Sequence, residues 1–258
     1  MWKKMNKSDD LKSSLQPQGE RYSLSQQVAN FESTVKNEVR RMMSEGNASE
    51  YLAKSIAVMV FGSNDYINNY LLAPIYTSSY NYTPPAYAAM LLDRYARQIL
   101  ALHAIGLRKF LISGIGPLGC IPNQRASGGA PPGRCAGYVN DMLVGFNKGL
   151  KSLVDTLNRN HPGAVFVYGN SYGAFLDILG NAASYGFKVV DRACCGIGRN
   201  QGQITCMPLQ VPCADRGEYL FWDAFHPTDA ANAVFAWRAY SGTPADCYPI
   251  NVKQMALL

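Results

Sequence analysis

The stretch Ser-Ile-Ala-Val-Met-Val-Phe at residues 55–61 decides the fold class of this chain of 258 residues. It is apolar throughout after its first residue, and a short continuous apolar run is typical of a parallel strand that is covered on both faces. Two similar runs follow at residues 108–113 (Arg-Lys-Phe-Leu-Ile-Ser) and 164–168 (Ala-Val-Phe-Val-Tyr). We therefore predict three buried strands at these positions.

Segments with helical periodicity lie before, between and after these strands. Apolar residues spaced three or four apart predict helices over residues 24–42, 84–105, 138–160 and 228–240. A capping box at Ser23 begins the first helix, which we expect Gly46 to end, and Thr228 caps the last one. A Gly- and Pro-rich loop is expected from residue 114 to about residue 134. Strands that alternate with helices of this length imply right-handed crossovers and a parallel α/β sheet.

Length and composition limit the classes of protein that fit this sequence. A chain of 258 residues suits one large domain, and 48% hydrophobic against 16% charged residues supplies a core and excludes intrinsic disorder. The net charge of +6 is not gathered into blocks of Lys and Arg, so we predict no nucleic-acid-binding surface. No apolar run approaches the roughly 18 to 20 residues of a membrane-spanning helix, so we predict no transmembrane segment.

Cysteine usage and the N-terminal residues indicate different compartments. Seven cysteines are many for a cytosolic enzyme, so some disulfides are expected, and the odd number leaves at least one thiol free or paired between chains. Their irregular spacing does not match a structural zinc site, and we predict neither a metal nor another cofactor. Residues 1–20 contain no apolar core of a signal peptide, so we predict none.

Two short motifs carry the residue types of acyl-transfer chemistry. Gly-Ser-Asn-Asp at residues 62–65 follows the first strand directly, and the carboxyl ends of parallel strands are where functional groups gather. Asp-Ala-Phe-His-Pro at residues 223–227 places Asp223 three residues before His226, close enough for the carboxylate to orient the imidazole as a general base. Asn64 offers two amide donors for a developing oxyanion. Taken singly, Asn64 also fits a turn residue, and His226 fits a helix start or the protein surface.

Together with Pro-Leu-Gly-Cys-Ile-Pro at residues 117–122 and Ala-Cys-Cys-Gly at residues 193–196, these motifs resemble the plant GDSL-type esterases and lipases of the SGNH-hydrolase superfamily. The resemblance extends from about Gly19 to Tyr248. It implies a flavodoxin-like three-layer α/β/α sandwich that hydrolyses carboxylic esters, often lipid acyl esters, without a metal or cofactor. Members of this family are typically secreted.

The same resemblance assigns roles to three residues. Asn64 would be an oxyanion donor, Asp223 the residue that orients the base, and His226 the general base. The partner that it implies is a small-molecule ester or lipid substrate.

The sequence departs from the family at the nucleophile. The family's serine lies in a Gly-Asp-Ser triplet near its N-terminus, and this sequence contains no Gly-Asp dipeptide. A second family block, whose glycine supplies a backbone oxyanion donor, is also absent. We therefore divide the chain into residues 1–18, which lack family resemblance, and an incomplete hydrolase domain at residues 19–258. Because loss of a serine nucleophile costs roughly 10⁶ in turnover, we expect this chain itself to be inactive.

The missing nucleophile leaves several alternatives open. The chain would be a truncated gene model, a splice form or a pseudoenzyme. An alternative function is that of a non-catalytic fragment or binding module that retains the wall of an acyl pocket. If the family's first strands are missing, residues 55–61 form a sheet edge with an uncovered face, and we expect self-association through that edge.

Two further motifs suggest different chemistry. Gly-Asn-Ser-Tyr-Gly at residues 169–173 fits the nucleophile elbow G-x-S-x-G and would make Ser171 the nucleophile of an α/β-hydrolase-like esterase with Asp223 and His226. Against this, that class takes its Asp and His from separate loops. Gly-Ile-Gly-Pro-Leu-Gly at residues 114–119 fits a dinucleotide fingerprint, but the prolines that follow deny it the helix N-terminus that would receive a pyrophosphate.

Overall fold

The computed structural model describes residues 22–71 and 78–258. Within them, β1, β2 and β3 run parallel and β8 is antiparallel to β3, so the sheet has the order β1-β2-β3-β8. The strands lie at Ile56–Val60, Lys109–Ser113, Val165–Gly169 and Cys247–Tyr248. The three predicted strands and their parallel arrangement are confirmed. The domain boundary predicted at residue 18 lies outside the described residues.

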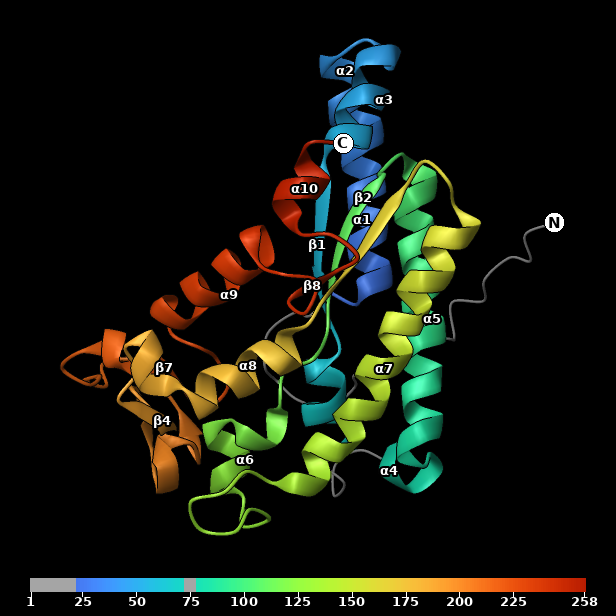
Figure 1. The fold of residues 1–258 in the computed structure, drawn as a ribbon. Coiled ribbons are helices and arrows are strands. Elements are labelled where there is room, and N and C mark those ends of the chain that lie inside the picture. The colour runs from blue at the N-terminus through green and yellow to red at the C-terminus, as the bar shows by residue number, and fades with distance from the viewer. Residues whose placement is uncertain (1–21, 72–77) are drawn as a thin grey trace.

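One face of the sheet packs against two long helices. α5 (Pro84–Ile105) and α7 (Gly137–Asn160) lie side by side, as Figure 1 shows, and both match the predicted helices closely. Side chains alternate between the two faces along each strand. Met59, Phe110 and Phe166, one from each parallel strand, therefore enter the main core on this side.

The other face of the sheet carries a second, smaller layer. α9 (Asp229–Ser241), which Thr228 caps as predicted, and α10 (Val252–Ala256) lie on the side opposite α5 and α7 (Figure 1). Leu111 and Val167 pack there against Met255 in a separate apolar cluster. Helices thus cover both faces of a largely parallel sheet, which is the α/β/α sandwich expected for this fold class.

The first predicted helix ends at Met42, the last residue of its predicted range, but Gly46 does not end it. Its helical turns run through α1 (Leu24–Thr34), a π-helix (Val35–Val39) and α2 (Arg40–Met42). The prediction that Gly46 ends it is wrong, because Gly46 lies in the first turn of a new helix, α3 (Glu45–Lys54). Met43 is extended, with φ −132° and ψ 155°. Ser44 then accepts a hydrogen bond from the N–H of Asn47, which is the usual way that serine begins a helix.

Shorter elements complete the described chain. The helices among them are α4 (Ser78–Asn81), α6 (Pro122–Ala126), α8 (Ser171–Gly180), a π-helix (Asp65–Tyr70) and 3₁₀ helices at Leu118–Cys120, Ala182–Tyr185, Arg199–Gln201 and Arg216–Glu218. Two small sheets pair β4 (Val189–Ala193) with β7 (Tyr219–Phe221), and β5 (Gly196–Ile197) with β6 (Ile204–Thr205). Across residues 22–71 and 78–258, no helix is both long and apolar enough to cross a bilayer.

The Gly- and Pro-rich loop after β2 is held against α7 by two asparagines. Asn147 accepts a hydrogen bond from the N–H of Ile115 and donates one to its carbonyl, both at 2.8 Å. Asn140 accepts from the N–H of Gly119 at 2.8 Å. A Cβ at Gly119 would lie 2.2 Å from the carbonyl oxygen of Ala136, so glycine is required for this close approach. The loop that resembled a dinucleotide fingerprint therefore packs on the protein's own helix.

Three disulfides cross-link the described chain, and they join Cys120 to Cys135, Cys194 to Cys213 and Cys195 to Cys206. The seventh cysteine, Cys247, is free and buried, and burial raises the pKa of its thiol to about 11. The expectation of disulfides with one thiol left over is confirmed.

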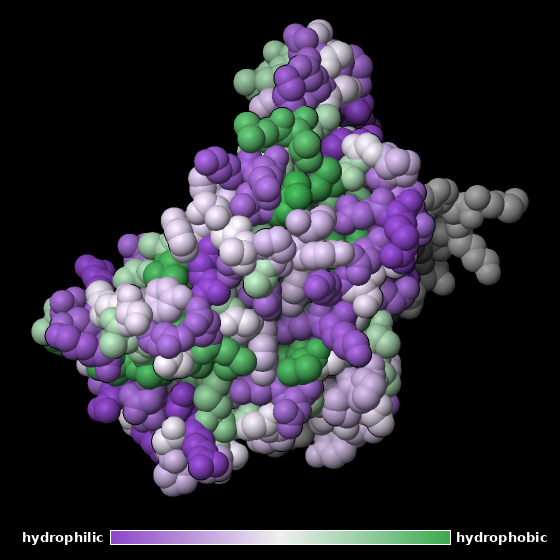
Figure 2. Space-filling view, viewed as in Figure 1, coloured by the Kyte–Doolittle hydropathy of each residue, from purple (hydrophilic) through white to green (hydrophobic). Residues whose placement is uncertain are grey.

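β1 is an edge strand in the part of the chain that the structure describes. It pairs with β2 alone. Val58 and Val60 point to the face that carries α9 and α10, yet they are 63% and 67% exposed, because those helices cover β1 less fully than β2 and β3 and only Ile56 of β1 packs against their apolar cluster. Figure 2 shows apolar surface where β1 and α10 lie in Figure 1. The expected edge with an uncovered apolar face is confirmed within the described residues.

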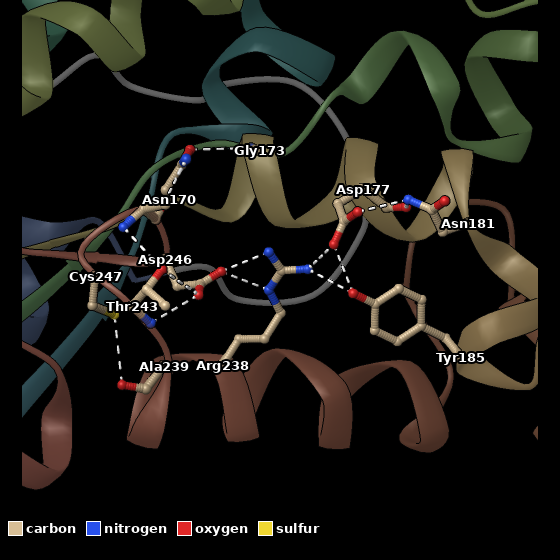
Figure 3. Close-up of polar contacts among 11 residues, drawn as sticks. Asn170, Gly173, Asp177, Asn181, Tyr185, Arg238, Ala239, Thr243, Asp246 and Cys247 are labelled. Carbon is tan, nitrogen blue, oxygen red and sulfur yellow. Dashed lines mark hydrogen bonds and ion pairs between the residues drawn. The ribbon is translucent and has the colours of Figure 1, made fainter.

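A network centred on Arg238 fastens α9 to its neighbours (Figure 3). The Arg238 guanidinium donates to the Asp246 carboxylate through Nε at 2.6 Å, and Nη1 pairs with Asp177 of α8. Tyr185 also donates to Asp177, at 2.6 Å. Hydrogen bonds from Tyr185, Arg238 and Asn181 together lower the pKa of Asp177 to about 2. Because the Arg238 side chain is 17% exposed, water does not readily replace these partners.

Replacing Arg238 tests how much this network contributes to stability. Arg238→Met keeps most of the apolar stem and removes the charge-assisted hydrogen bonds to Asp246, so we expect the free energy of unfolding to fall by about 2 kcal/mol. Arg97→Met is a matched control, because Arg97 pairs with Asp93 on the surface of α5, where the two side chains are 50% and 68% exposed. The control should cost less than about 0.5 kcal/mol. Chemical denaturation measures both, and equal losses would contradict a structural role for the network.

Candidate active site

Asp223 and His226 lie in the turn between β7 and α9, and the structure brings their side chains into contact. Nδ1 of His226 is 2.9 Å from each carboxylate oxygen of Asp223. Oδ1 of Asp223 also accepts hydrogen bonds from the N–H groups of Phe225 at 2.9 Å and His226 at 2.7 Å. The contact predicted from the three-residue spacing is present, and the catalytic role of the pair stays a prediction.

The local sequence explains why the chain turns here. An aspartate that accepts backbone N–H groups two and three residues ahead stabilises a tight turn. The N–H of Trp222 donates to the carbonyl of His226 at 2.8 Å, which closes the turn. Pro227 follows, and Thr228 then begins α9 by accepting from the N–H of Ala231. The imidazole is therefore held between the end of a strand and the start of a helix.

The electrostatics of the pair suit a general base and the residue that orients it. Burial raises the pKa of Asp223, but hydrogen bonds from His226 and from the N–H groups of Phe225 and His226 outweigh burial and leave this pKa below its usual value. The hydrogen bond to Asp223 raises the pKa of His226 above its usual value. The Asp223 side chain is 13% exposed and that of His226 is 73% exposed. Because Nδ1 is engaged, Nε2 is the ring nitrogen that can take a proton from a reacting group.

Asn64 lies just beyond the carboxyl end of β1, as the sequence predicted. Gly62, at φ +109°, makes the turn out of the strand, and Asn64 begins the π-helix Asp65–Tyr70. Its side chain is exposed and makes no capping hydrogen bond with that helix. Among the described residues, no hydrogen bond joins Asn64 to Asp223 or His226. Its role as an oxyanion donor stays a prediction.

Ser171 is placed differently from the nucleophile elbow that its motif suggested. It is the first residue of α8, and its Oγ lies 2.6 Å from Oγ of Ser113 at the end of β2. The structure shows no hydrogen bond between Ser171 and His226. A nucleophile elbow is a strained turn, whereas Ser171 does not belong to the described residues with positive φ. The local geometry is thus that of an ordinary strand-to-helix connection.

Thr205 is a member of the site that the sequence analysis missed. Its hydroxyl donates to Oδ2 of Asp223 at 3.2 Å. The two residues are far apart in the chain, and no local pattern links them. The nearest signal in the sequence is the neighbouring Cys206, because a disulfide at that position implies that Thr205 is fixed to another segment.

The described residues offer no metal centre. Nowhere in residues 22–71 and 78–258 do three or more His, Cys, Asp or Glu side chains gather in a way that would hold a metal ion. His103 and His161 form a pair, with ring centroids 5.2 Å apart, beside Phe166. Burial, Arg108 and His161 lower the pKa of His103, which fits a structural histidine.

Comparison with known proteins places this chain in a family. The model of the GDSL-like lipase/acylhydrolase family matches residues 6–238. Three GDSL esterases/lipases of Arabidopsis thaliana are 61%, 52% and 49% identical to it over 240, 243 and 242 residues. These alignments cover 93% of this chain but only 64%, 63% and 66% of the relatives. The chain belongs to the GDSL-like lipase/acylhydrolase family, as its motifs suggested, and spans about two thirds of the length of these relatives.

Removing the charge of Asp223 tests the coupling within the pair. Asp223→Asn keeps the shape of the side chain, and we expect the pKa of His226 to fall toward the usual value of 6.5, because the carboxylate no longer stabilises the imidazolium. The pKa is measured by NMR of the imidazole protons as a function of pH. Asp229→Asn is the control, since Asp229 lies in the first turn of α9 without a hydrogen bond to the ring. An equal fall in both variants would contradict the specific pairing.

Proposed function

We propose that the protein is a carboxylic ester hydrolase of GDSL type in which Asp223 and His226 are the orienting acid and the general base. The observation that carries the proposal is the contact of both Asp223 oxygens with Nδ1 of His226, which leaves Nε2 free, in a chain of this family. The substrate class is an ester with an apolar acyl chain. The relatives of this chain in Arabidopsis thaliana are named GDSL esterase/lipase, which supports this substrate class.

The proposed chemistry uses these residues in sequence. Nε2 of His226 accepts the proton of a serine hydroxyl while its oxygen attacks the ester carbonyl, and Asp223 stabilises the imidazolium that forms. Asn64 donates an N–H to the oxyanion. His226 then returns the proton to the leaving alcohol, and the acyl-enzyme is hydrolysed by the same steps with water as the nucleophile.

Whether this chain can hydrolyse esters by itself depends on whether it contains the serine nucleophile. Its sequence has no Gly-Asp-Ser triplet, and the Oγ of Ser171 lies against Ser113 and not against His226. We therefore propose that the chain of 258 residues does not hydrolyse esters alone. A non-catalytic module that retains the apolar groove beside β1 is the second candidate function. This groove has a volume of about 670 Å³, and Val58, Val60 and Leu111 form one of its walls.

We further propose that the protein reaches an oxidising compartment and is secreted. The three disulfides of the described chain support this, because such cross-links form and persist in the secretory pathway and outside the cell.

Activity measurements separate these functions. We expect the 258-residue chain to show no labelling by a fluorophosphonate probe and no hydrolysis of p-nitrophenyl butyrate. We then consider a chimera in which this chain replaces the matched region of the 61%-identical relative, so that the rest of the relative supplies the missing parts in their own order. We expect this chimera to hydrolyse the ester. In this chimera, His226→Ala should lower the rate by at least about 10³, and His103→Ala should not.

Two results would overturn the proposals. A chimera that folds and hydrolyses esters equally well with His226→Ala would remove His226 from the mechanism. Labelling of the 258-residue chain that Ser171→Ala abolishes would establish the nucleophile-elbow alternative.

We also propose that two copies of this chain associate through their β1 strands. In a parallel pair, only alternate residues of a strand bond to their neighbour, so β1 leaves other N–H and C=O groups for a partner. The strand Ile56–Val60 contains no charge, proline or bulge, so a second β1 can align with it antiparallel across a twofold axis. Val58 and Val60 of both copies would then share one apolar strip.

A charge on the exposed face of β1 tests the association. We expect the wild-type chain to form dimers in sedimentation velocity at micromolar concentration, and we expect Val58→Lys to shift it to monomers, because two lysines would face each other. Val144→Lys on α7 is the matched control, since Val144 is 51% exposed. A monomeric wild type, or the same behaviour in both variants, would contradict the proposal.

A further inference from the structure

We propose that Thr205 is a positioning residue for Asp223 and His226, and that the Cys195–Cys206 disulfide holds Thr205 in place. The importance of this position for a reaction rests on the proposed function. The position itself is a property of the folded chain.

Thr205 is the last residue of a very small hairpin. β5 and β6 are two residues long, and Gly196 pairs with Thr205. A hairpin with so few ladder bonds is marginal in water. Cys195 and Cys206 immediately flank this pair, and their disulfide, with a Cα–Cα distance of 5.0 Å, closes the open end of the hairpin. The covalent bond therefore supplies the rigidity that the ladder lacks.

The same cysteine ties the hairpin to the turn of the site. The N–H of Cys195 donates to the carbonyl of Trp222 at 2.8 Å, directly before Asp223. One residue earlier, the N–H of Cys194 donates to the carbonyl of Phe221 at 3.0 Å. The hairpin is thus attached to the backbone that carries the carboxylate, and the Thr205 hydroxyl donates to Oδ2 of Asp223.

The Thr205 hydroxyl donates to Oδ2 of Asp223, the carboxylate oxygen that accepts no hydrogen bond from the backbone of the turn. Oδ1 of Asp223 is held by the N–H groups of Phe225 and His226, and these bonds belong to the turn itself. Among the described residues, Oδ2 has only Thr205 and the imidazole as hydrogen-bond partners. Without the hydroxyl, the carboxylate can pivot about Oδ1 and lose its second contact with the ring. Asp223 is the titratable group whose charge acts on His226, so the pivot changes how the ring titrates.

NMR titration of the His226 ring tests the inference on the full chain. We expect Thr205→Val to lower the pKa of His226 toward 6.5. Thr205→Ser keeps the hydroxyl, so we expect this variant to keep the wild-type pKa of His226. The double variant Cys195→Ser/Cys206→Ser should lower the pKa as Thr205→Val does. Adding Thr205→Val to it should produce no further shift, because both changes act through one hydrogen bond.

Controls separate positioning from a general loss of structure. Thr156→Val removes a hydroxyl whose hydrogen bonds, to the carbonyl of Ser152 and from Arg159, both lie within α7, and it should leave the titration unchanged. A pKa of His226 that Thr205→Val does not lower, a Thr205→Ser variant that behaves like Thr205→Val, or additive shifts would overturn the inference. Because this readout requires no turnover, an inactive chimera would count against the proposed function and not against the position of Thr205.

Discussion

Parallel pairing of three five-residue strands is the constraint on which the rest of the structure depends. It gives the sheet one face for α5 and α7 and another for α9 and α10, because side chains alternate along each strand. It also places the carboxyl ends of β1, β2 and β3 at one edge, where Ser113 ends β2 and Asn64 and Ser171 lie just beyond β1 and β3. The second layer covers β2 and β3 more fully than β1, and this asymmetry leaves Val58 and Val60 exposed.

The candidate acid–base pair depends on local backbone geometry and not on this sheet directly. Asp223 gathers the N–H groups of its own turn, so the carboxylate is fixed wherever the turn is fixed. This turn lies between a short strand, β7, and the cap of α9. A carboxylate that is 13% exposed keeps its charge because four donors surround it, and that charge favours the protonated imidazole.

Sequence patterns predicted the elements that are long or continuous. The apolar runs at residues 55–61, 108–113 and 164–168 became strands. A buried parallel strand needs little besides apolar side chains, and this holds for β2 and β3, whereas β1 is a strand with Val58 and Val60 exposed. The prediction that Gly46 ends the first helix was wrong because glycine is only one way to end a helix. Ser44, two residues before Gly46, caps the start of the next helix. The hairpin of β5 and β6 carries no periodicity in its two-residue strands, and the spacing of seven cysteines does not determine which of them pair.

Whether a contact is local or distant in the sequence explains which residues of the candidate site could be predicted. Asp223 and His226 are three residues apart, so a turn brings them together and their contact follows from spacing alone. Thr205 meets Asp223 because two disulfides cross-link residues 194–213 and backbone hydrogen bonds from Cys194 and Cys195 attach this segment to Phe221 and Trp222. A cross-linked segment of this kind does not need a hydrophobic core of its own, so its sequence is free of the patterns by which cores are recognised. This segment delivers one polar side chain, that of Thr205, to the half-buried carboxylate of Asp223.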